Sequence, residues 1–153
     1  MIEITKIVEW DMGHRVPKHK SKCRHPHGHR YRAEVTVTGP LIEASGSSSE
    51  GMVMDFSDIK SVITTHVHDV LDHGFMVYEG DAIMTRLLIE EANGKEACDF
   101  NIIKVSFVPT AENIVQWCYE QIKNELPEGV VVSKIRLFET PNSWADYRPG
   151  SKC

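Results

Sequence analysis

The sequence predicts an α+β domain in which two long helices cover one small antiparallel sheet. Three observations predict this class. Apolar residues alternate in segments near both ends of the chain, as in strands with one buried face. Two longer segments between them repeat apolar residues every three or four positions, as helices do. The chain has 153 residues, which is enough for one domain with a buried core, so we expect a single domain over residues 1–153.

The first half of the expected sheet is a pair of strands joined by a basic, proline-containing loop. Apolar residues alternate from Ile2 to Trp10, and the break in that pattern at Lys6-Ile7 indicates a bulge. The alternation from Tyr31 to Thr38 is clearer and predicts the second strand. The serine- and glycine-rich stretch that follows predicts a flexible loop at about residues 44–51.

The remaining elements alternate between helices and strands, with one extra segment at about residues 78–101. In chain order we expect a helix over Phe56–Leu71, a short extra helix over Ala82–Ala92 that ends at Asn93-Gly94, a strand over Asn101–Phe107, a second long helix from Thr110 to Leu126 and a last strand over Val130–Glu139. A four-stranded sheet leaves its edge strands exposed. Pairing of edges between subunits is one way to satisfy them, which favours a homo-oligomer.

Composition excludes several classes of protein. The net charge of −5 argues against general nucleic-acid binding. No apolar stretch approaches the about 20 residues that span a bilayer, so we expect no membrane association. The amino-terminal residues lack the pattern of a secretory signal, and the four cysteines are irregularly spaced without a CxxC pair. We therefore expect a cytoplasmic protein with free thiols.

A histidine cluster at the start of the second strand predicts a metal site. His27 and His29 are two residues apart, so on a strand both side chains point to one face. A catalytic zinc ion takes three protein ligands and keeps a fourth position open. His14 is the natural candidate for the third ligand. His25 has the same parity as His27 and competes with it, although Pro26 disfavours regular strand geometry there.

Cys23 lies in the same loop and has two interpretations. Neighbouring lysine and arginine residues and imidazoles favour a thiolate, which is the reactive form of cysteine. The alternatives are a fourth zinc ligand and an inert surface thiol. Lys18, Lys20 and Arg24 belong to a basic island around this cysteine, which could attract a polyanionic small molecule. A solvated lysine loop would explain the same run of charges.

Two carboxylates elsewhere are further candidates. Asp72 and His73 follow the first predicted helix and could form an acid–base pair, because a carboxylate can orient and tune an imidazole. The alternative is an ordinary helix end, with Gly74 as the terminating residue. Glu139 shares the parity of the apolar residues in the last strand, so we expect it to be partly buried and to require a hydrogen-bonding partner.

Taken together, these segments resemble the 6-pyruvoyl-tetrahydropterin synthase family, and within it they are most similar to the bacterial 6-carboxy-tetrahydropterin synthases. The matching segments occur in the family's order over nearly the whole chain: Gly13-His14-Arg15, Cys23 with His27-Gly28-His29, Met54-Asp55-Phe56, Leu71-Asp72-His73, Pro109 to Asn113 and Glu139-Thr140-Pro141. The gap of three residues between Cys23 and His27 is typical of the bacterial enzymes. Three features depart from the family pattern: Gly13, where the family usually has Ala or Ser, His25-Pro26 before His27-Gly28-His29, and the long 78–101 segment.

The resemblance implies a role for each matching residue. It implies that His14, His27 and His29 bind one zinc ion per subunit, that Cys23 accepts a proton and that Asp72 with His73 forms the charge-relay base. It implies that Glu139 anchors the pterin ring and that Thr110 and Glu112 line the pterin pocket. We add the expectation that Lys18, Lys20 and Arg24 bind the triphosphate.

The resemblance also implies an architecture and a reaction. The fold would be the tunnelling fold, a four-stranded antiparallel sheet with two helices between strands two and three. Three such sheets would close into a barrel, and two trimers would stack into a hexamer. The implied reaction converts 7,8-dihydroneopterin triphosphate to 6-carboxy-5,6,7,8-tetrahydropterin, acetaldehyde and triphosphate, in queuosine or another 7-deazapurine pathway. The alternatives are triphosphate elimination alone, which gives 6-pyruvoyl-tetrahydropterin, and a non-catalytic pterin- or zinc-binding protein.

Overall fold

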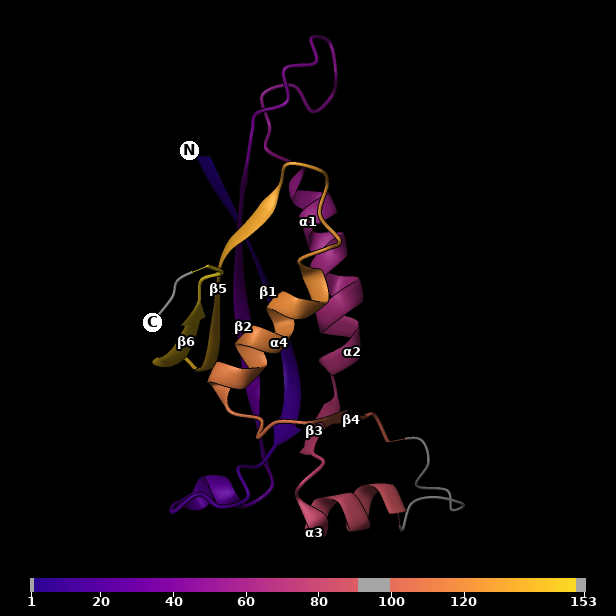
Figure 1. Ribbon diagram of the computed structural model, residues 1–153, viewed down its shortest axis with the longest axis vertical. Helices are drawn as coiled ribbons and strands as arrows, with labels where there is room; N and C mark the ends of the chain where they lie inside the picture. Colours follow the sequence, from indigo (N-terminus) through magenta and orange to yellow (C-terminus); the bar gives the residue numbers. More distant parts are fainter. Residues whose placement is uncertain (1, 91–99, 151–153) are drawn as a thin grey trace.

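The computed structural model describes residues 2–90 and 100–150. Six strands form one mixed sheet in the order β4-β3-β1-β2-β5-β6. The elements in chain order are β1 (Ile2–His14), η1 (Lys22–Arg24), β2 (His27–Gly39), α1 (Phe56–Ile63), η2 (Thr64–His68), α2 (Asp69–Leu71), β3 (Gly74–Tyr78), α3 (Ala82–Thr85), η3 (Arg86–Glu90), β4 (Ile102–Val105), α4 (Ala111–Ile122), β5 (Val131–Thr140) and β6 (Ser143–Tyr147). The long β1–β2 pair runs along the longest axis of the molecule (Figure 1).

The β1–β2 pair is regular and longer than the alternation of apolar residues indicates. Its antiparallel register runs without a shift from Ile2 opposite Gly39 to His14 opposite His27. The predicted bulge at Lys6-Ile7 is therefore wrong. Ile7 points outward and is 45% exposed, so the strand accepts an apolar residue on its solvent face without a change of register. Both strands continue into the segment that the sequence assigns to a loop.

The first long helix lies where it was predicted, but it is not α-helical throughout. α1, η2 and α2 are contiguous over 56–71, and the middle segment η2 is π-helical. The side chain of Asp55 caps the start of α1 by accepting a 2.6 Å hydrogen bond from the Ser57 amide. The second long helix, α4, begins after the cap Thr110 as predicted. It ends at Ile122, before the predicted Leu126.

The sheet corrects the predicted four antiparallel strands. The chain forms two further strands, β3 and β6, and both pairings of β3, with β1 and with β4, are parallel. Only Asp72 and His73 separate α2 from β3, and β3 is five residues long. A segment this short is too brief to show an alternating apolar pattern of its own. β6 is a short return strand in which Trp144 and Asp146 lie on the exposed side. The α+β class holds, but the sheet is mixed.

The extra segment contains α3 followed by the π-helical η3, which agrees with the predicted helix as far as Glu90. Its predicted end at Asn93-Gly94 lies outside the described residues. The 44–51 stretch contains turns and no helix or strand. Among the described residues, no helix is both long and apolar enough to cross a membrane.

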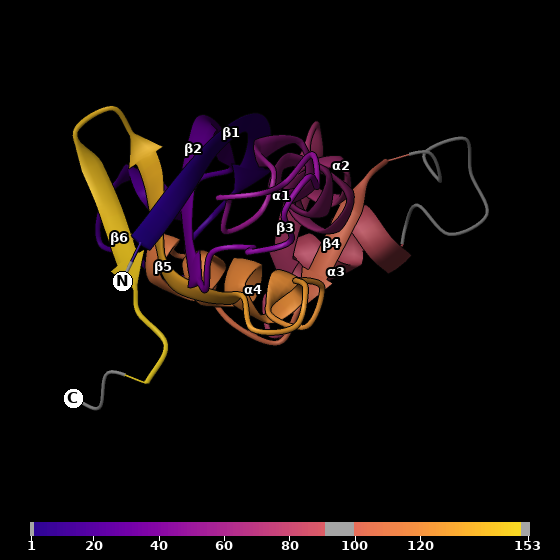
Figure 2. The same ribbon diagram turned by 90° about the horizontal axis from the view of Figure 1, so that it is seen from above.

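One hydrophobic core lies between the sheet and the two long helices. Fully buried residues on β1 and β2, including Trp10 and Tyr31, face Ile63 of α1 and Ile114 of α4 in a single cluster. Figure 2 shows α4 lying along the strands, with α1 and α2 beside it. At one end of this core β1 ends, β2 begins and α4 begins (Figure 1), so three elements converge on the histidine cluster.

Candidate active site

Three histidines converge at the end of the β1–β2 pair. His14 lies opposite His27 in the strand register, and His29 is two residues further along the same face of β2. One ring nitrogen of each lies within 4.8 Å of the others, as binding of a common metal ion requires. The third member of the group is His14. His25, the competing candidate, is exposed and lies outside the group.

Backbone contacts orient two of these rings. His14 Nδ1 donates a 2.6 Å hydrogen bond to the Pro109 carbonyl, and His27 Nδ1 donates a 2.7 Å bond to the His25 carbonyl. Each bond leaves Nε2 of that ring unprotonated and available to a metal. The Nε2 atoms of His14 and His29 are buried and have no hydrogen-bonding partner among the described residues.

Burial favours the uncharged form of His14 and His29. Loss of hydration lowers the pKa of His14 to about 4, and burial also lowers the pKa of His29, against the opposing effect of the Glu139 carboxylate. Neutral imidazole is the form that binds a metal. Three imidazole nitrogens, two of them buried without a hydrogen-bonding partner among the described residues, are a donor set that zinc prefers, and the group therefore fits a zinc ion.

A cavity of about 290 Å³ opens beside the histidine group. It collects residues from β1, the following loop, the start of α4, the end of β5 and β6. Its lining residues are His14, Val16, His19, Cys23, Thr110, Ala111, Glu112, Glu139, Ser143, Trp144 and Ala145. Five residues singled out from the sequence, from four separate segments, therefore meet in one cavity.

Glu139 lines this cavity and lies close to two of the histidines. Its carboxylate Oε1 is 3.6 Å from His14 Nε2 and 3.9 Å from His29 Nε2. The side chain is 27% exposed, which confirms the prediction of partial burial from its parity with Leu137. A half-exposed carboxylate at the cavity wall can accept hydrogen bonds from a ligand with N–H donors.

Cys23 lies in the short 3-10 turn η1, and its thiol reaches the cavity. Val16 N–H donates a 2.8 Å hydrogen bond to the Cys23 carbonyl, and the Ser21 hydroxyl lies 3.9 Å from Sγ. Cys23 is half-buried and free of any disulfide. Cys118 is also free, but it is buried on α4, where burial raises its pKa to about 12. Cys98 and Cys153 lie outside the described residues.

The basic residues of the loop do not reach this cavity in the single chain. Lys18, Lys20 and Arg24 are exposed and are not among its lining residues. The Arg24 guanidinium instead donates to the Lys20 carbonyl at 3.2 Å. Sequence reasoning missed His19 and Trp144, which line the cavity. Recognition of β6 would have placed Trp144 beside Glu139, because β6 pairs with the end of β5.

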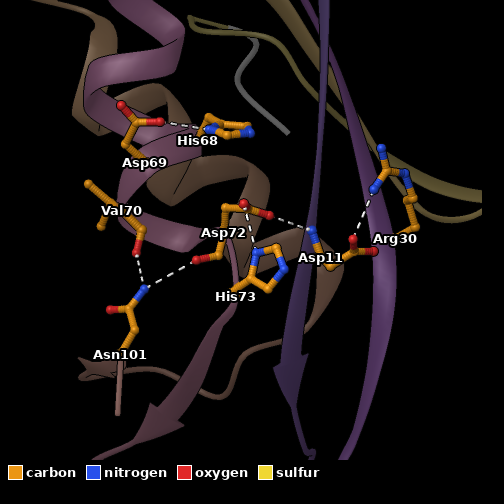
Figure 3. Close-up of polar contacts among 8 residues, drawn as sticks. All are labelled: Asp11, Arg30, His68, Asp69, Val70, Asp72, His73 and Asn101. Carbon is orange, nitrogen blue, oxygen red and sulfur yellow. Dashed lines mark hydrogen bonds and ion pairs between the residues drawn. The ribbon is translucent and has the colours of Figure 1, made fainter. Parts of the chain in front are cut away.

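Asp72 and His73 form the predicted pair but lie outside the cavity (Figure 3). Asp72 Oδ2 is 2.8 Å from His73 Nδ1, and Asp72 Oδ1 accepts a 3.0 Å hydrogen bond from the Asp11 amide. That backbone bond is the main reason why the pKa of Asp72 is lowered. The His73 side chain is 81% exposed. Both residues border a separate apolar groove that includes Phe75 and Leu87.

The backbone at this pair differs from an ordinary helix end. α2 ends at Leu71, and the left-handed conformation falls on His73 (φ 57°) rather than on Gly74. A non-glycine residue in that conformation is uncommon and costs free energy, so the surrounding contacts must hold it. The Asn101 amide provides such contacts by donating to the carbonyls of Val70 (3.1 Å) and Asp72 (3.4 Å).

Gly13, which departs from the resemblance, is explained by its contact with β3. A Cβ atom at Gly13 would lie 2.4 Å from Cδ2 of Phe75, so the Phe75 ring occupies the space of an alanine methyl group. Gly28 faces Gly13 across the strand pair. These two glycines let β3 and β2 approach the end of β1 closely, next to the histidine group.

Comparisons with known proteins find similar sequences over nearly the whole chain. The family model described as 6-pyruvoyl tetrahydropterin synthase matches residues 3–150. The 6-carboxy-5,6,7,8-tetrahydropterin synthase of Haemophilus influenzae is 32% identical over 97% of this chain and 99% of its own length. The protein of the same name from Rickettsia bellii is 34% identical over 95% and 99%.

Solved structures show the same fold. An uncharacterized protein from Wolinella succinogenes superposes with a TM-score of 0.79 at 25% identity, over 97% of this chain and 98% of its own. The 6-pyruvoyl tetrahydropterin synthase of Caenorhabditis elegans superposes with a TM-score of 0.67 at 20% identity, over 97% and 96%. With a family match over nearly all its length, the chain belongs to the 6-pyruvoyl tetrahydropterin synthase family.

Proposed function

We propose that this protein is a zinc-dependent carbon–carbon lyase that converts 7,8-dihydroneopterin triphosphate to 6-carboxy-5,6,7,8-tetrahydropterin, acetaldehyde and triphosphate. The observation that carries the proposal is one cavity shared by a member of the buried histidine group, a free thiol and a half-buried carboxylate. The curated relatives named for this synthase, over almost their whole length, support the choice of reaction.

His14, His27 and His29 would hold the zinc ion, the first two through the Nε2 atoms that their backbone bonds leave free. When bound, zinc acts as a Lewis acid toward substrate oxygen atoms. The low pKa of His14 keeps its ring available as a ligand at neutral pH, because its burial disfavours the protonated form.

The cavity walls would bind and orient the pterin ring. Glu139 offers a carboxylate to the ring's amino and N–H donors, and Thr110 and Glu112 line the wall at the start of α4. Trp144 adds a flat indole surface that is 49% exposed and held from one side by Phe138, at 5.3 Å between ring centroids. Such positioning of a reactant contributes strongly to rate.

Proton transfer would be shared between two groups. Cys23, on the cavity wall, would take a proton from the substrate side chain. His73, oriented by Asp72, would serve as the second acid–base group. Lys18, Lys20 and Arg24 would hold the triphosphate, since all three are exposed and none has a carboxylate partner in the part of the chain that the structure describes.

The separate location of Asp72 and His73 supports an oligomeric active site. Neither residue lines the cavity of its own chain, so a neighbouring subunit would have to bring them there. We therefore propose a homo-oligomer, in the form of a hexamer made of two trimers. Edge strands β4 and β6 would pair between subunits and close the sheets into the tunnelling-fold barrel. The pathway to a 7-deazapurine and the cytoplasmic location stay predictions.

Product analysis on the zinc-loaded protein tests the proposal. Incubation with 7,8-dihydroneopterin triphosphate should give 6-carboxy-tetrahydropterin and acetaldehyde in equal amounts by mass spectrometry. Formation of 6-pyruvoyl-tetrahydropterin without acetaldehyde would instead assign triphosphate elimination alone. Pterin binding without steady turnover would make the protein a non-catalytic member of the family.

A further inference from the structure

Arg15 joins the histidine strand to the extra segment. It directly follows His14, and its side chain reaches Asp81, at the start of α3. Arg15 Nε is 2.5 Å from Asp81 Oδ2, and Nη2 is 2.8 Å from Oδ1. The side chains are 15% and 4% exposed. This is a two-bonded, largely buried ion pair, which is the geometry in which arginine and carboxylate bind most specifically.

The same guanidinium also contacts the turn that carries the thiol. Arg15 Nη1 donates a 3.3 Å hydrogen bond to the Arg24 carbonyl. The next residue, Val16, donates its N–H to the Cys23 carbonyl at 2.8 Å. Arg15 and Val16, the two residues that follow β1, therefore donate hydrogen bonds to the carbonyls of Arg24 and Cys23. These bonds hold the backbone of the turn next to the thiol.

Asp81 is itself firmly placed. Its amide donates to the Tyr78 carbonyl at 2.9 Å, which ties it to the end of β3. Its side chain caps α3 by accepting from the Met84 amide at 3.4 Å, and its carbonyl accepts from Thr85 at 2.9 Å. The residue is 5% exposed. Asp81 therefore links the sheet, the extra segment and Arg15.

We propose that Arg15 and Asp81 together position the Cys23 turn, and that bracing this turn is a role of the extra segment. Neither residue lines the cavity, so they act on the chemistry only through the thiol that they hold. The effect on catalysis rests on the proposed function, in which Cys23 moves a proton. The effect on the structure of the turn is independent of the proposed function.

The chemistry of the two side chains explains why this pair is suited to the task. Only arginine can offer two parallel N–H groups to one carboxylate and a further N–H to a carbonyl. Lysine would keep the positive charge opposite Asp81, but it lacks the planar, forked guanidinium that binds Asp81 and the Arg24 carbonyl at the same time. Asparagine in place of Asp81 would still cap α3, but it would remove the charge that holds the guanidinium.

Two variants test the proposal, R15K and D81N, with R148K as the matched arginine-to-lysine control at an exposed pair. Hydrogen–deuterium exchange should follow the amides of 16–25, because Val16, His19, Arg24 and His25 all donate backbone bonds there. In both variants we expect this peptide to exchange at least about tenfold faster, while the α4 peptide exchanges as in the parent. R148K should change neither.

Kinetics provide the second readout. In R15K and D81N we expect kcat to fall about 10- to 100-fold, with KM within about twofold of the parent and an unchanged zinc content. The double variant should lose no more kcat than the worse single variant, because the two residues act as one unit.

Each outcome decides the matter. Unchanged exchange at 16–25 in both variants would overturn the brace, whatever the activity. Faster exchange with unchanged kcat would show that the turn is braced but does not control the chemistry. Because exchange needs no substrate, a parent protein without turnover would refute the proposed function and leave the brace testable.

Discussion

The histidine cavity and the Asp72–His73 pair contrast sharply in burial and support. His14 is 1% exposed, and its ring is fixed between Pro109 and its histidine neighbours. The His73 side chain is 81% exposed; its ring contacts the carboxylate of the adjacent Asp72, and its backbone amide donates a 2.8 Å hydrogen bond to the Asp11 carbonyl. The first region brings three potential metal ligands together within one chain. The second is a hydrogen-bonded carboxylate–imidazole pair whose imidazole is exposed.

This difference teaches that the folded chain assembles the histidine group by itself, whereas the Asp72–His73 pair stays outside the cavity of its own chain. The histidines are placed by strand register, which the hydrophobic core beneath them enforces. The Asp72–His73 pair is placed by an uncommon backbone conformation with contacts from Asp11 and Asn101. These contacts hold the uncommon conformation at an exposed position, as the proposed subunit interface would require.

The largest expected effect comes from breaking the histidine group. H27A should lose stoichiometric zinc and lower kcat/KM by on the order of 10³-fold or more, because metal catalysis supplies several kcal/mol. H25A is the matched control, since His25 contributes only its backbone carbonyl to His27. Metal analysis and steady-state kinetics measure both. Zinc retention in H27A would contradict the assignment of the ligands.

Mixing of two inactive variants tests whether the two regions meet between subunits. C23A and H73A should each lose about 10²- to 10⁴-fold in kcat and keep their zinc, because each removes one acid–base group. When the two are co-refolded, sites that combine an intact Cys23 with a neighbour's intact His73 should restore a measurable fraction of activity. No recovery in verified mixed oligomers would place both groups within one chain's site.

A smaller effect is expected at the cavity wall. W144A should raise KM about 3- to 10-fold and leave kcat nearly unchanged, because an aromatic stacking contact contributes about 0.5–1.5 kcal/mol. F56A is the control, since Phe56 is similarly exposed at the start of α1, away from the cavity. A fall in kcat with a constant KM would show that Trp144 acts on the reaction itself rather than on binding.

The smallest effect concerns the stability supplied by Asp72. The Asp11 amide lowers the pKa of Asp72 below its ordinary value of 3.8, so the carboxylate stabilises the folded state above that pH. This contribution is lost as the pH falls through the lowered value. The stability advantage of the parent over D72N should therefore be constant from pH 5 to 7 and shrink below about pH 4. Urea unfolding at a series of pH values measures it, and a pH-independent difference would contradict the assigned pKa.

The sequence predicted the parts of the molecule that local patterns determine. Strand parity placed His27 and His29 on one face, and the caps Asp55 and Thr110 marked both long helices. The residues themselves also suggested His14 as the third histidine and Glu139 as a partly buried carboxylate, and the family resemblance added their implied roles; the fold brings the two within 3.6 Å. The predicted first strand stopped at Trp10, although Met12 and His14 continue the buried parity of Val8 and Trp10 and β1 extends to His14.

Other features depend on tertiary contacts that no local pattern reveals. β3 and β6 are too short to have their own signal and form because neighbouring strands offer edges. The basic loop looked like a phosphate site from its charge alone, but its side-chain directions depend on the turn around Cys23. The contact between Arg15 and Asp81 spans 66 positions and has no sequence signature.

The regular β1–β2 register limits which insertions and deletions this enzyme can tolerate during evolution. The ligands lie on paired strands, where one inserted residue would turn the following side chains to the opposite face. The thiol lies on the connecting loop, which can lengthen or shorten while both strands keep their register. Under the proposed function, changes in loop length would move Cys23 relative to the substrate without moving the histidines that would hold zinc. The paired strands would conserve the metal site, and the loop would be free to change the proton-transfer step.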